Sequence, residues 1–318
     1  MKYLVTLSSI EPFIFGGDNT FGKLGDEING TYLVKSRQFP QQSAILGMLK
    51  KEIMTQNNLL TRQLKGEWVE PKNKQKAENL VGVEKFDIFS KSIQNFGKIK
   101  NISPMFFIKN DEIFIKKVDI DSFDFEDGVL KGYKTKIDIY DNFINIATNE
   151  KLTSDKIFKP IEKTANKKGG EENSLFKKTS YLLNDNFKFA FYLDCDCDLK
   201  NSIITLGADR SSFKMEVKED NSTLNYEDKK AYLTLISDAY ITLSLKDNCD
   251  FAITSEISYQ NLQNQKHAFK HNEFKKSDKV YLYEKGSVII NPSQALIDDL
   301  NNKNLQQIGY NIFTKGKN

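Results

Sequence analysis

Several features that would mark particular classes of protein are scarce or missing in this sequence. Its 318 residues include six prolines and three cysteines, Cys195, Cys197 and Cys249, which form no CxxC pair. No apolar run approaches the length of a membrane span, and the first residues do not resemble a secretion signal. An odd number of unpaired cysteines is typical of a reduced compartment. We therefore expect a cytoplasmic protein with no membrane contact. The length of the chain suggests about two domains.

The net charge is also small: at a formal +3 it excludes a polycation that holds nucleic acid by bulk charge. Arginine is rare, at positions 37, 62 and 210, and lysine supplies the other basic residues. An A/T-rich genome would explain this preference. Residues 151–180 hold eight lysines against four acids, an excess of four positive charges, while the rest of the chain is slightly negative. This segment is either a phosphate-facing loop or a solvated insertion.

The hydrophobic pattern predicts a mixture of helices and strands. Residues 2–8 alternate as a buried strand does, a glycine-dotted loop follows over residues 15–25, and residues 40–54 have the spacing of an amphipathic helix. The polar, lysine-rich residues 72–77 indicate a surface excursion. Further strands are predicted over residues 105–108, 113–116, 136–141, 187–193, 202–206, 213–217, 231–237, 240–245 and 279–283. The pattern is that of an α+β protein in two halves that meet near residue 185.

Motifs for catalysis are missing. There is no GxxxxGK[ST], strand–GxGxxG–helix or GxSxG motif. His267 and His271 have the i, i+4 spacing of zinc ligands on a helix but lack a third ligand and the glutamate of HExxH. Residues 194–198 alternate Asp and Cys, yet Leu199 stands where a calcium loop needs glycine. We therefore expect no metal, no cofactor and no catalytic residues, with an RNA-cleaving histidine as the alternative.

A short turn over residues 206–213 contains the only arginine of the C-terminal half, Arg210, next to two serines. A glycine turn that presents an arginine and hydroxyl groups can bind a phosphate or a splayed base. It is equally compatible with an ordinary hairpin turn.

Taken together, several stretches resemble the RAMP superfamily of CRISPR–Cas proteins. The closest resemblance is to the Cas-five-group subunit (subunit three) of type III-B (Cmr) effector complexes, which holds the 5′ handle of the guide RNA (crRNA). The resembling stretches are residues 11–22, 39–50, 160–181, 206–210, 285–288 and 308–312. They extend along the whole chain, although Ala208 and Asn311 stand where the family commonly has glycine. The corresponding subunit of a type III-A or III-D complex, or a RAMP endoribonuclease that uses His267 or His271, remains an alternative.

This resemblance implies tandem ferredoxin-like (RRM-like) modules with insertions. The first would span residues 1–185, with the lysine-rich insertion at about 151–180, and the second residues 186–318. It implies a non-catalytic scaffold in antiviral RNA-guided interference, with three partners: the crRNA 5′ handle, the large polymerase-like subunit and the backbone RAMP subunits.

Handle recognition would use splayed bases and clamped phosphates. A helix N-terminus, cations and close backbone approach at glycine supply such contacts. The residues we expect to contact RNA are Gly16, Gly17, Gln41, Gln42, Ser43, Lys163, Lys167, Lys168, Gly207 and Arg210. Phe15 and Phe39 could stack on a base or lie in the core.

Overall fold

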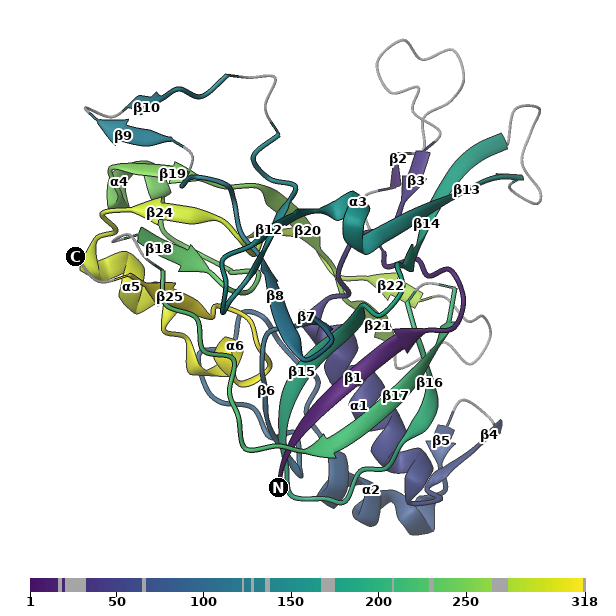
Figure 1. The fold of residues 1–318 in the computed structure, drawn as a ribbon. Helices are drawn as coiled ribbons and strands as arrows, with labels where there is room; N and C mark the ends of the chain where they lie inside the picture. Colours follow the sequence, from purple (N-terminus) through teal and green to yellow (C-terminus); the bar gives the residue numbers. More distant parts are fainter. Residues whose placement is uncertain are drawn as a thin grey trace.

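The computed structural model describes residues 1–16, 19–20, 33–64, 67–121, 123–126, 129–134, 138–166, 175–207, 209–228, 232–264 and 274–316. Its largest sheet has nine strands in the order β12-β11-β8-β7-β15-β1-β17-β16, and β6 also pairs with β15 (Figure 1). These strands are β1 (Lys2–Ser9), β6 (Ile99–Ile102), β7 (Phe106–Lys109), β8 (Glu112–Lys116), β11 (Asn142–Asn145), β12 (Lys151–Thr153), β15 (Lys188–Cys195), β16 (Ser202–Leu206) and β17 (Ser211–Glu219).

Two four-stranded sheets and several two-stranded ribbons complete the fold. One sheet has the order β13-β14-β3-β2, and the other has the order β19-β24-β18-β25. Their strands are β2 (Asn19–Thr20), β3 (Leu33–Lys35), β13 (Phe158–Asn166), β14 (Leu175–Leu183), β18 (Tyr232–Leu235), β19 (Phe251–Ile253), β24 (Val288–Ile290) and β25 (Phe313–Lys315). The ribbons pair β4 (Leu60–Leu64) with β5 (Glu67–Val69), β9 (Asp124–Glu126) with β10 (Val129–Lys131), β20 (Glu256–Tyr259) with β23 (Val280–Tyr283), and β21 (Leu262–Asn264) with β22 (Phe274–Lys276). Apart from the β3–β14 pair, which is parallel, these strands pair antiparallel.

In the described part of the chain the helices are few and short except for α1 (Gln42–Gln56), which confirms the predicted amphipathic helix. Ile45, Leu46, Leu49 and Ile53, which share one face of the helix, are all buried in the main core. Each such side chain contributes about 1.5 to 3 kcal/mol by leaving water, so this face attaches the helix to the large sheet. The other helices are α2 (Lys74–Val81), α3 (Ser154–Ile157), α4 (Leu245–Asn248), α5 (Gln294–Leu300) and α6 (Lys303–Gln307), with a 3-10 turn η1 (Pro71–Asn73).

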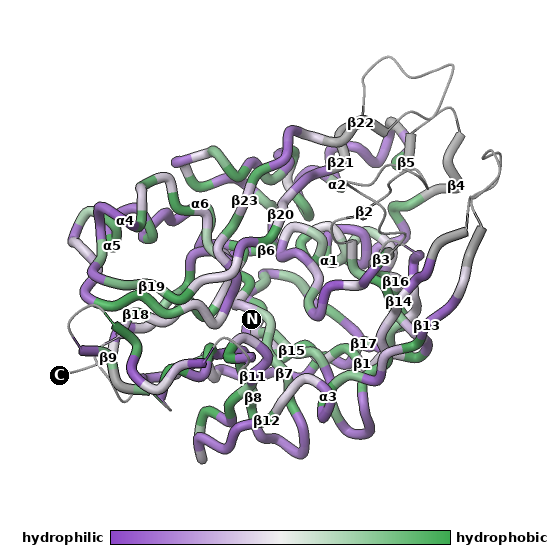
Figure 2. The backbone as a smooth tube through the Cα atoms, turned by 90° about the horizontal axis from the view of Figure 1, so that it is seen from above, coloured by the Kyte–Doolittle hydropathy of each residue, from purple (hydrophilic) through white to green (hydrophobic). Residues whose placement is uncertain are grey.

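The central strands have a separate core on each face of the sheet. In β15, Phe189, Phe191 and Leu193 belong to the core beneath α1, whereas Ala190 and Tyr192 face the opposite cluster. This is the period of two that a strand buried on both faces requires. The hairpin β13–β14 projects from this body, and β13 is largely hydrophilic (Figures 1 and 2).

Three predicted elements differ from the structure. Residues 72–77, expected as a surface excursion, form η1 and the start of α2, because Ala77 and Val81 bury one face of that helix. Of the strand expected over residues 136–141, the described part, residues 138–141, bends instead, with the Tyr140 N–H donating to Asp138, and β11 begins at Asn142. The strand expected over residues 240–245 is absent because this segment bonds to the Asp299 side chain of α5 rather than to a neighbouring strand.

The domain boundary near residue 185 stays a prediction, and strands on both sides of it belong to one sheet. Strand β15, which follows it, pairs with β1 and β7, so residues 188–219 complete the sheet that the N-terminal residues begin. The observed fold is mixed α+β with mostly antiparallel sheets, and the tandem ferredoxin-like modules stay a prediction. Among the described residues, no helix has both the length and the apolar character needed to cross a membrane.

Candidate nucleic-acid interface

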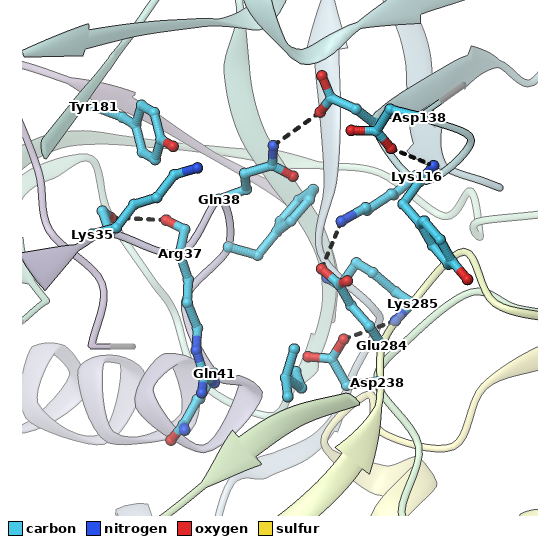
Figure 3. Close-up of a pocket in the computed structure, with 15 residues that line it drawn as sticks. Lys35, Arg37, Gln38, Gln41, Lys116, Asp138, Tyr181, Asp238, Glu284 and Lys285 are labelled. Atoms are coloured by element: carbon cyan, nitrogen blue, oxygen red, sulfur yellow. Dashed lines mark hydrogen bonds and ion pairs between the residues drawn. The ribbon is translucent and has the colours of Figure 1, made fainter. Parts of the chain in front are cut away.

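A cavity of about 260 Å³ lies where the start of α1 meets β3, β8, β14, β20 and three loops (Figure 3). It combines cations, carboxylates, two amides and two phenols on walls from distant parts of the chain. The lining residues labelled in the figure are Lys35, Arg37, Gln38, Gln41, Lys116, Asp138, Tyr181, Asp238, Glu284 and Lys285. A cavity of this size and polarity can hold one small polar group and contact it from several directions at once.

The segment between β3 and α1 is fixed by hydrogen bonds to its neighbours. The Ser36 hydroxyl accepts from the Phe15 N–H at 2.9 Å, and the Ser36 N–H donates to the Thr179 carbonyl at 2.9 Å. These bonds present the side chains on either side of Ser36 to the cavity. Lys35 is exposed and forms no ion pair with a described residue, whereas Arg37 donates to the Ser258 hydroxyl at 2.9 Å.

Cations and carboxylates balance inside the cavity. The Lys116 ammonium lies 2.6 Å from the Glu284 carboxylate, and both side chains are mostly buried. Asp238 accepts from the backbone N–H of Lys285 at 2.9 Å. The interior is therefore close to neutral, and the charge available to an anion lies at Lys35 on the rim.

Lys285 is a buried cation at the base of the cavity. Its ammonium lies 3.9 Å from the centre of the Phe39 ring and 3.4 Å from the Met105 carbonyl oxygen. Burial lowers the pKa of this lysine, although Asp238 and Glu284 act in the opposite direction. The contact with the ring face compensates part of the lost hydration, as cation–π contacts do.

Gln38 has a buried side-chain oxygen without a hydrogen-bond donor among the described residues. Its Nε2 donates to Asp141 at 3.4 Å, but its Oε1 is buried and accepts no hydrogen bond from a described residue. A buried acceptor without a donor costs about 1 to 3 kcal/mol. A ligand that supplies an N–H or O–H group at this position would recover that energy.

The predicted residues at the start of α1 are divided between different environments. Gln41 lines the cavity. Gln42 is only 2% exposed, and its Nε2 donates to the Ser103 carbonyl at 2.8 Å and to the Gly309 carbonyl at 3.3 Å, so its side chain attaches α1 to two loops. The Ser43 N–H donates to the Tyr310 hydroxyl at 3.4 Å and lies outside this cavity.

Phe15 and Phe39 both lie in the main core, so neither ring is exposed to a base. Phe15 packs against Phe13 with ring centres 4.6 Å apart, and Phe39 packs against Phe107 at 4.8 Å. The core interpretation of these two aromatics is confirmed.

The turn that contains Gly207 and Arg210 joins β16 to β17 as a hairpin and packs against the backbone of Ile14, two residues before the exposed Gly16. Gly207 has a φ of +93°, and a Cβ at this position would lie 2.5 Å from the Ile14 carbonyl oxygen. Only glycine fits such a close approach. The Arg210 side chain is exposed, with its N–H bonded to the Gly207 carbonyl at 3.2 Å.

Lys163 lies on β13 directly opposite Lys178 of β14, and its side chain is exposed. Lys178 forms an ion pair with Asp209, which connects the projecting hairpin to the 207–210 turn. Gly17, Lys167, Lys168, His267 and His271 lie outside the described residues. No group of three or more His, Cys, Asp or Glu side chains in the described part of the chain could hold a metal ion.

The cavity adds residues that the sequence did not single out as RNA contacts: Lys35, Arg37, Gln38 and Lys116. The first two flank Ser36 immediately before the predicted helix start, which was the available signal. Lys116 carried none, because its β8 position reaches the cavity only through the pairing of the large sheet.

No protein-family model and no curated protein matches this chain. Among solved structures, a chain of type III-B Cmr-beta bound to cognate target RNA matches with a TM-score of 0.55 and 13% identity, covering 99% of this chain and 96% of that chain. The same assembly bound to cognate target RNA and AMPPnP gives a TM-score of 0.54 at 13% identity, with coverage of 98% and 96%. A chain of the Csm3-Csm4 subcomplex of a type III-A interference complex reaches only 0.38 at 14% identity, which is too low to support an argument. The chain thus shares its fold, over nearly its whole length, with a component of type III-B Cmr-beta.

Proposed function

We propose that this protein is a non-catalytic RNA-binding subunit of a type III CRISPR effector complex, of the type III-B (Cmr) subtype. In that role it holds the 5′ handle of the crRNA, docks the large polymerase-like subunit and meets the backbone RAMP subunits. Support comes from motifs along the whole sequence and from a fold shared end to end with a chain of Cmr-beta.

The observation that carries the RNA-binding part is the cavity at the start of α1. It offers an exposed cation at its rim, Lys35, and a buried acceptor without a donor, Gln38 Oε1. A splayed nucleotide supplies both complements, a phosphate and the N–H groups of a base edge. Arg210 and Lys163, on the adjoining turn and hairpin, would contact phosphates further along the strand.

The test is to purify the tagged protein from its native host, with its associated proteins and RNA, and to sequence the RNA 5′ ends. We expect RNAs that share one repeat-derived 5′ end. The Lys35→Glu variant should retain the protein partners but lose this common RNA end. Lys76→Glu is the matched control, because Lys76 is an exposed lysine on α2, which packs against α1 rather than lining the cavity. RNA with no common 5′ end, or equal loss in the two variants, would reject the proposal.

Binding of the RNA identified in this way should also weaken with salt. Each phosphate contact to a single strand contributes about 0.7 to the slope of log K against log salt. Removing Lys35 or Arg210 should therefore reduce the slope by about 0.7 each, whereas the control should leave it unchanged. The partner proteins identified by mass spectrometry would separate type III-B from type III-A and III-D.

The non-catalytic assignment is tested separately. The double variant His267→Ala/His271→Ala should process a precursor repeat RNA no differently from the unmodified protein. Cleavage that depends on either histidine would support the endoribonuclease instead.

A further inference from the structure

Two of the three cysteines meet at the end of the central strand β15. The Sγ atoms of Cys195 and Cys197 lie 2.7 Å apart. This is closer than the roughly 3.5 to 4 Å at which non-bonded heavy atoms usually pack, and within about 0.7 Å of a disulfide bond length. Both cysteines are free thiols in this structure.

The local backbone explains the approach of the two sulfurs. Residues i and i+2 of a strand point to the same face, with Cα atoms about 6.5 Å apart, which lies within the range that disulfides span. The pairing of β15 with β6 has an irregularity between Asp194 and Cys195, and the chain bends immediately afterwards. The bend turns the two side chains toward each other.

The surrounding hydrogen bonds hold this geometry. Cys195 donates its N–H to the Met1 carbonyl at 2.9 Å and accepts from the N-terminal ammonium at 3.0 Å. The Tyr3 hydroxyl donates to the Cys197 carbonyl at 3.1 Å. Both cysteines are thus fixed to the start of β1, so the sulfurs stay in proximity without an additional ordering cost.

The two thiols differ in reactivity in a way that suits oxidation. Cys195 is fully buried, and the hydrogen bond with Cys197 together with burial raises its pKa. Cys197 is partly exposed, and the hydrogen bond from the Cys195 thiol, helped by the charge of Lys98, lowers its pKa. A partly exposed thiol that ionises readily is the one that peroxides attack.

We propose that Cys195 and Cys197 form an oxidation site, at which a hydroperoxide converts the two thiols into a disulfide. The Cys197 thiolate sulfur attacks one peroxide oxygen and the O–O bond breaks. The leaving hydroxide takes up the proton that the Cys197 thiol released when it ionised, which gives one water, and Cys197 becomes a sulfenic acid. The Cys195 sulfur then attacks the Cys197 sulfur, the S–O bond breaks, and the departing hydroxide takes the Cys195 proton. Hydrogen peroxide is reduced to two waters while two thiols are oxidised to one disulfide.

The experiment uses the whole protein, reduced, freed of reductant and treated with hydrogen peroxide. Trypsin releases both cysteines on the single peptide 189–200, because Lys188 and Lys200 flank them and no Lys or Arg lies between. We expect this peptide to become lighter by two hydrogen atoms and to resist N-ethylmaleimide until dithiothreitol is added. Cys249, whose Sγ is bonded to the Leu245 carbonyl and which has no cysteine nearby, is the internal control and should still be alkylated.

Single substitutions separate the two roles. Cys195→Ser should leave a Cys197 sulfenic acid that dimedone traps, and Cys197→Ser should abolish the peroxide reaction at this peptide. Cys249→Ser should change neither result. If either variant fails to fold, labelling of the unmodified protein decides the question alone. Peptide 189–200 that remains fully alkylatable after peroxide, or that oxidises no faster than the Cys249 peptide, would overturn the proposal.

Discussion

The buried ion pair between Lys117 and Asp228 allows a quantitative test of how this fold is held together. Both side chains are almost completely buried, at 2% and 1% exposure, and the ammonium lies 3.0 Å from the carboxylate. Asp228 also accepts from the Thr234 hydroxyl at 2.8 Å, and Lys117 contacts Asp121 at 2.9 Å. Burial alone would lower the pKa of Lys117, but Asp228, Tyr226 and Asp121 together raise it above its ordinary value.

Removing one partner leaves the other charge buried without its counterion. Asp228→Ala or Lys117→Met should therefore each cost about 3 to 5 kcal/mol of the free energy of unfolding. The double variant Lys117→Met/Asp228→Leu removes both charges and fills the space, so it should recover most of this loss. The resulting coupling energy in the double-mutant cycle should exceed about 2 kcal/mol.

The assay is urea unfolding followed by far-UV circular dichroism. The exposed pair Lys131–Glu126, on the β9–β10 ribbon with side chains 57% and 59% exposed, is the matched control and should couple by less than about 1 kcal/mol. Because the pKa of Lys117 is raised in the folded state, the stabilisation is present at and below neutral pH and is lost only as pH rises above 10.5. The cost of each substitution should thus be constant across neutral pH. A double variant no more stable than the single variants would refute this reasoning.

Other substitutions test local geometry and ionisation. Gly207→Ala should lower the free energy of unfolding by about 2 to 4 kcal/mol, because the new Cβ would meet the Ile14 carbonyl at a positive φ. Gly47→Ala lies within helix α1 and has open space around its Cβ, so it should raise the free energy of unfolding by about 0.5 to 1 kcal/mol. Urea midpoints of the two variants test the difference. Hydrogen bonds from two lysines lower the pKa of Glu216 to about 2. The ionised carboxylate therefore stabilises the fold fully above pH 4.5, and this contribution is lost as the pH falls toward 2. Glu216→Gln should accordingly weaken the fall of the free energy of unfolding at acid pH. Burial lowers the pKa of Lys50 to about 8 in the folded protein, so between pH 8 and 10.5 the unfolded chain binds more protons than the folded one. The free energy of unfolding should therefore rise with pH over that range, and Lys50→Met should abolish the rise.

The sequence predicted local structure well where the hydrophobic residues follow a clear helical spacing or a clear strand alternation. The helical spacing of Ile45, Leu49 and Ile53 predicted α1 to within two residues of its ends, and the alternation around Phe189 predicted β15. It failed where a distant polar group decides the backbone, as at residues 240–245, which bond to Asp299. Strand pairing is non-local as well: no pattern within β15 reveals that β1 and β7 lie beside it, so the sequence did not predict that strands on both sides of residue 185 share one sheet.

The candidate site was predictable only in part for the same reason. The hairpin turn at Gly207 and the helix start at Gln41 have local signals, and the structure contains both. The cavity itself joins residues from β3, β8, β14 and the loop at Lys285, which together span more than two hundred residues of the chain. Gln42 illustrates the limit of motif reasoning, because a helix-start position that suggested a ligand contact is occupied by bonds to the Ser103 and Gly309 carbonyls.

Charge counted along the sequence also differs from charge counted in space. Residues 151–180 have an excess of four positive charges, but Lys178 pairs with Asp209 and Lys151 pairs with Asp119, two acids from outside that segment. Much of the local excess is thus compensated before any ligand arrives. Because the cavity is balanced as well, attraction of a polyanion by net charge is a weak basis for recognition here. Discrimination between RNA ligands would depend on hydrogen-bonding groups with a fixed direction, of which the buried Gln38 Oε1 is the clearest. The exposed Lys35 would add one short-range charge contact that salt screens. A protein built in this way would bind one RNA end at one place and leave the rest of its near-neutral surface to protein neighbours.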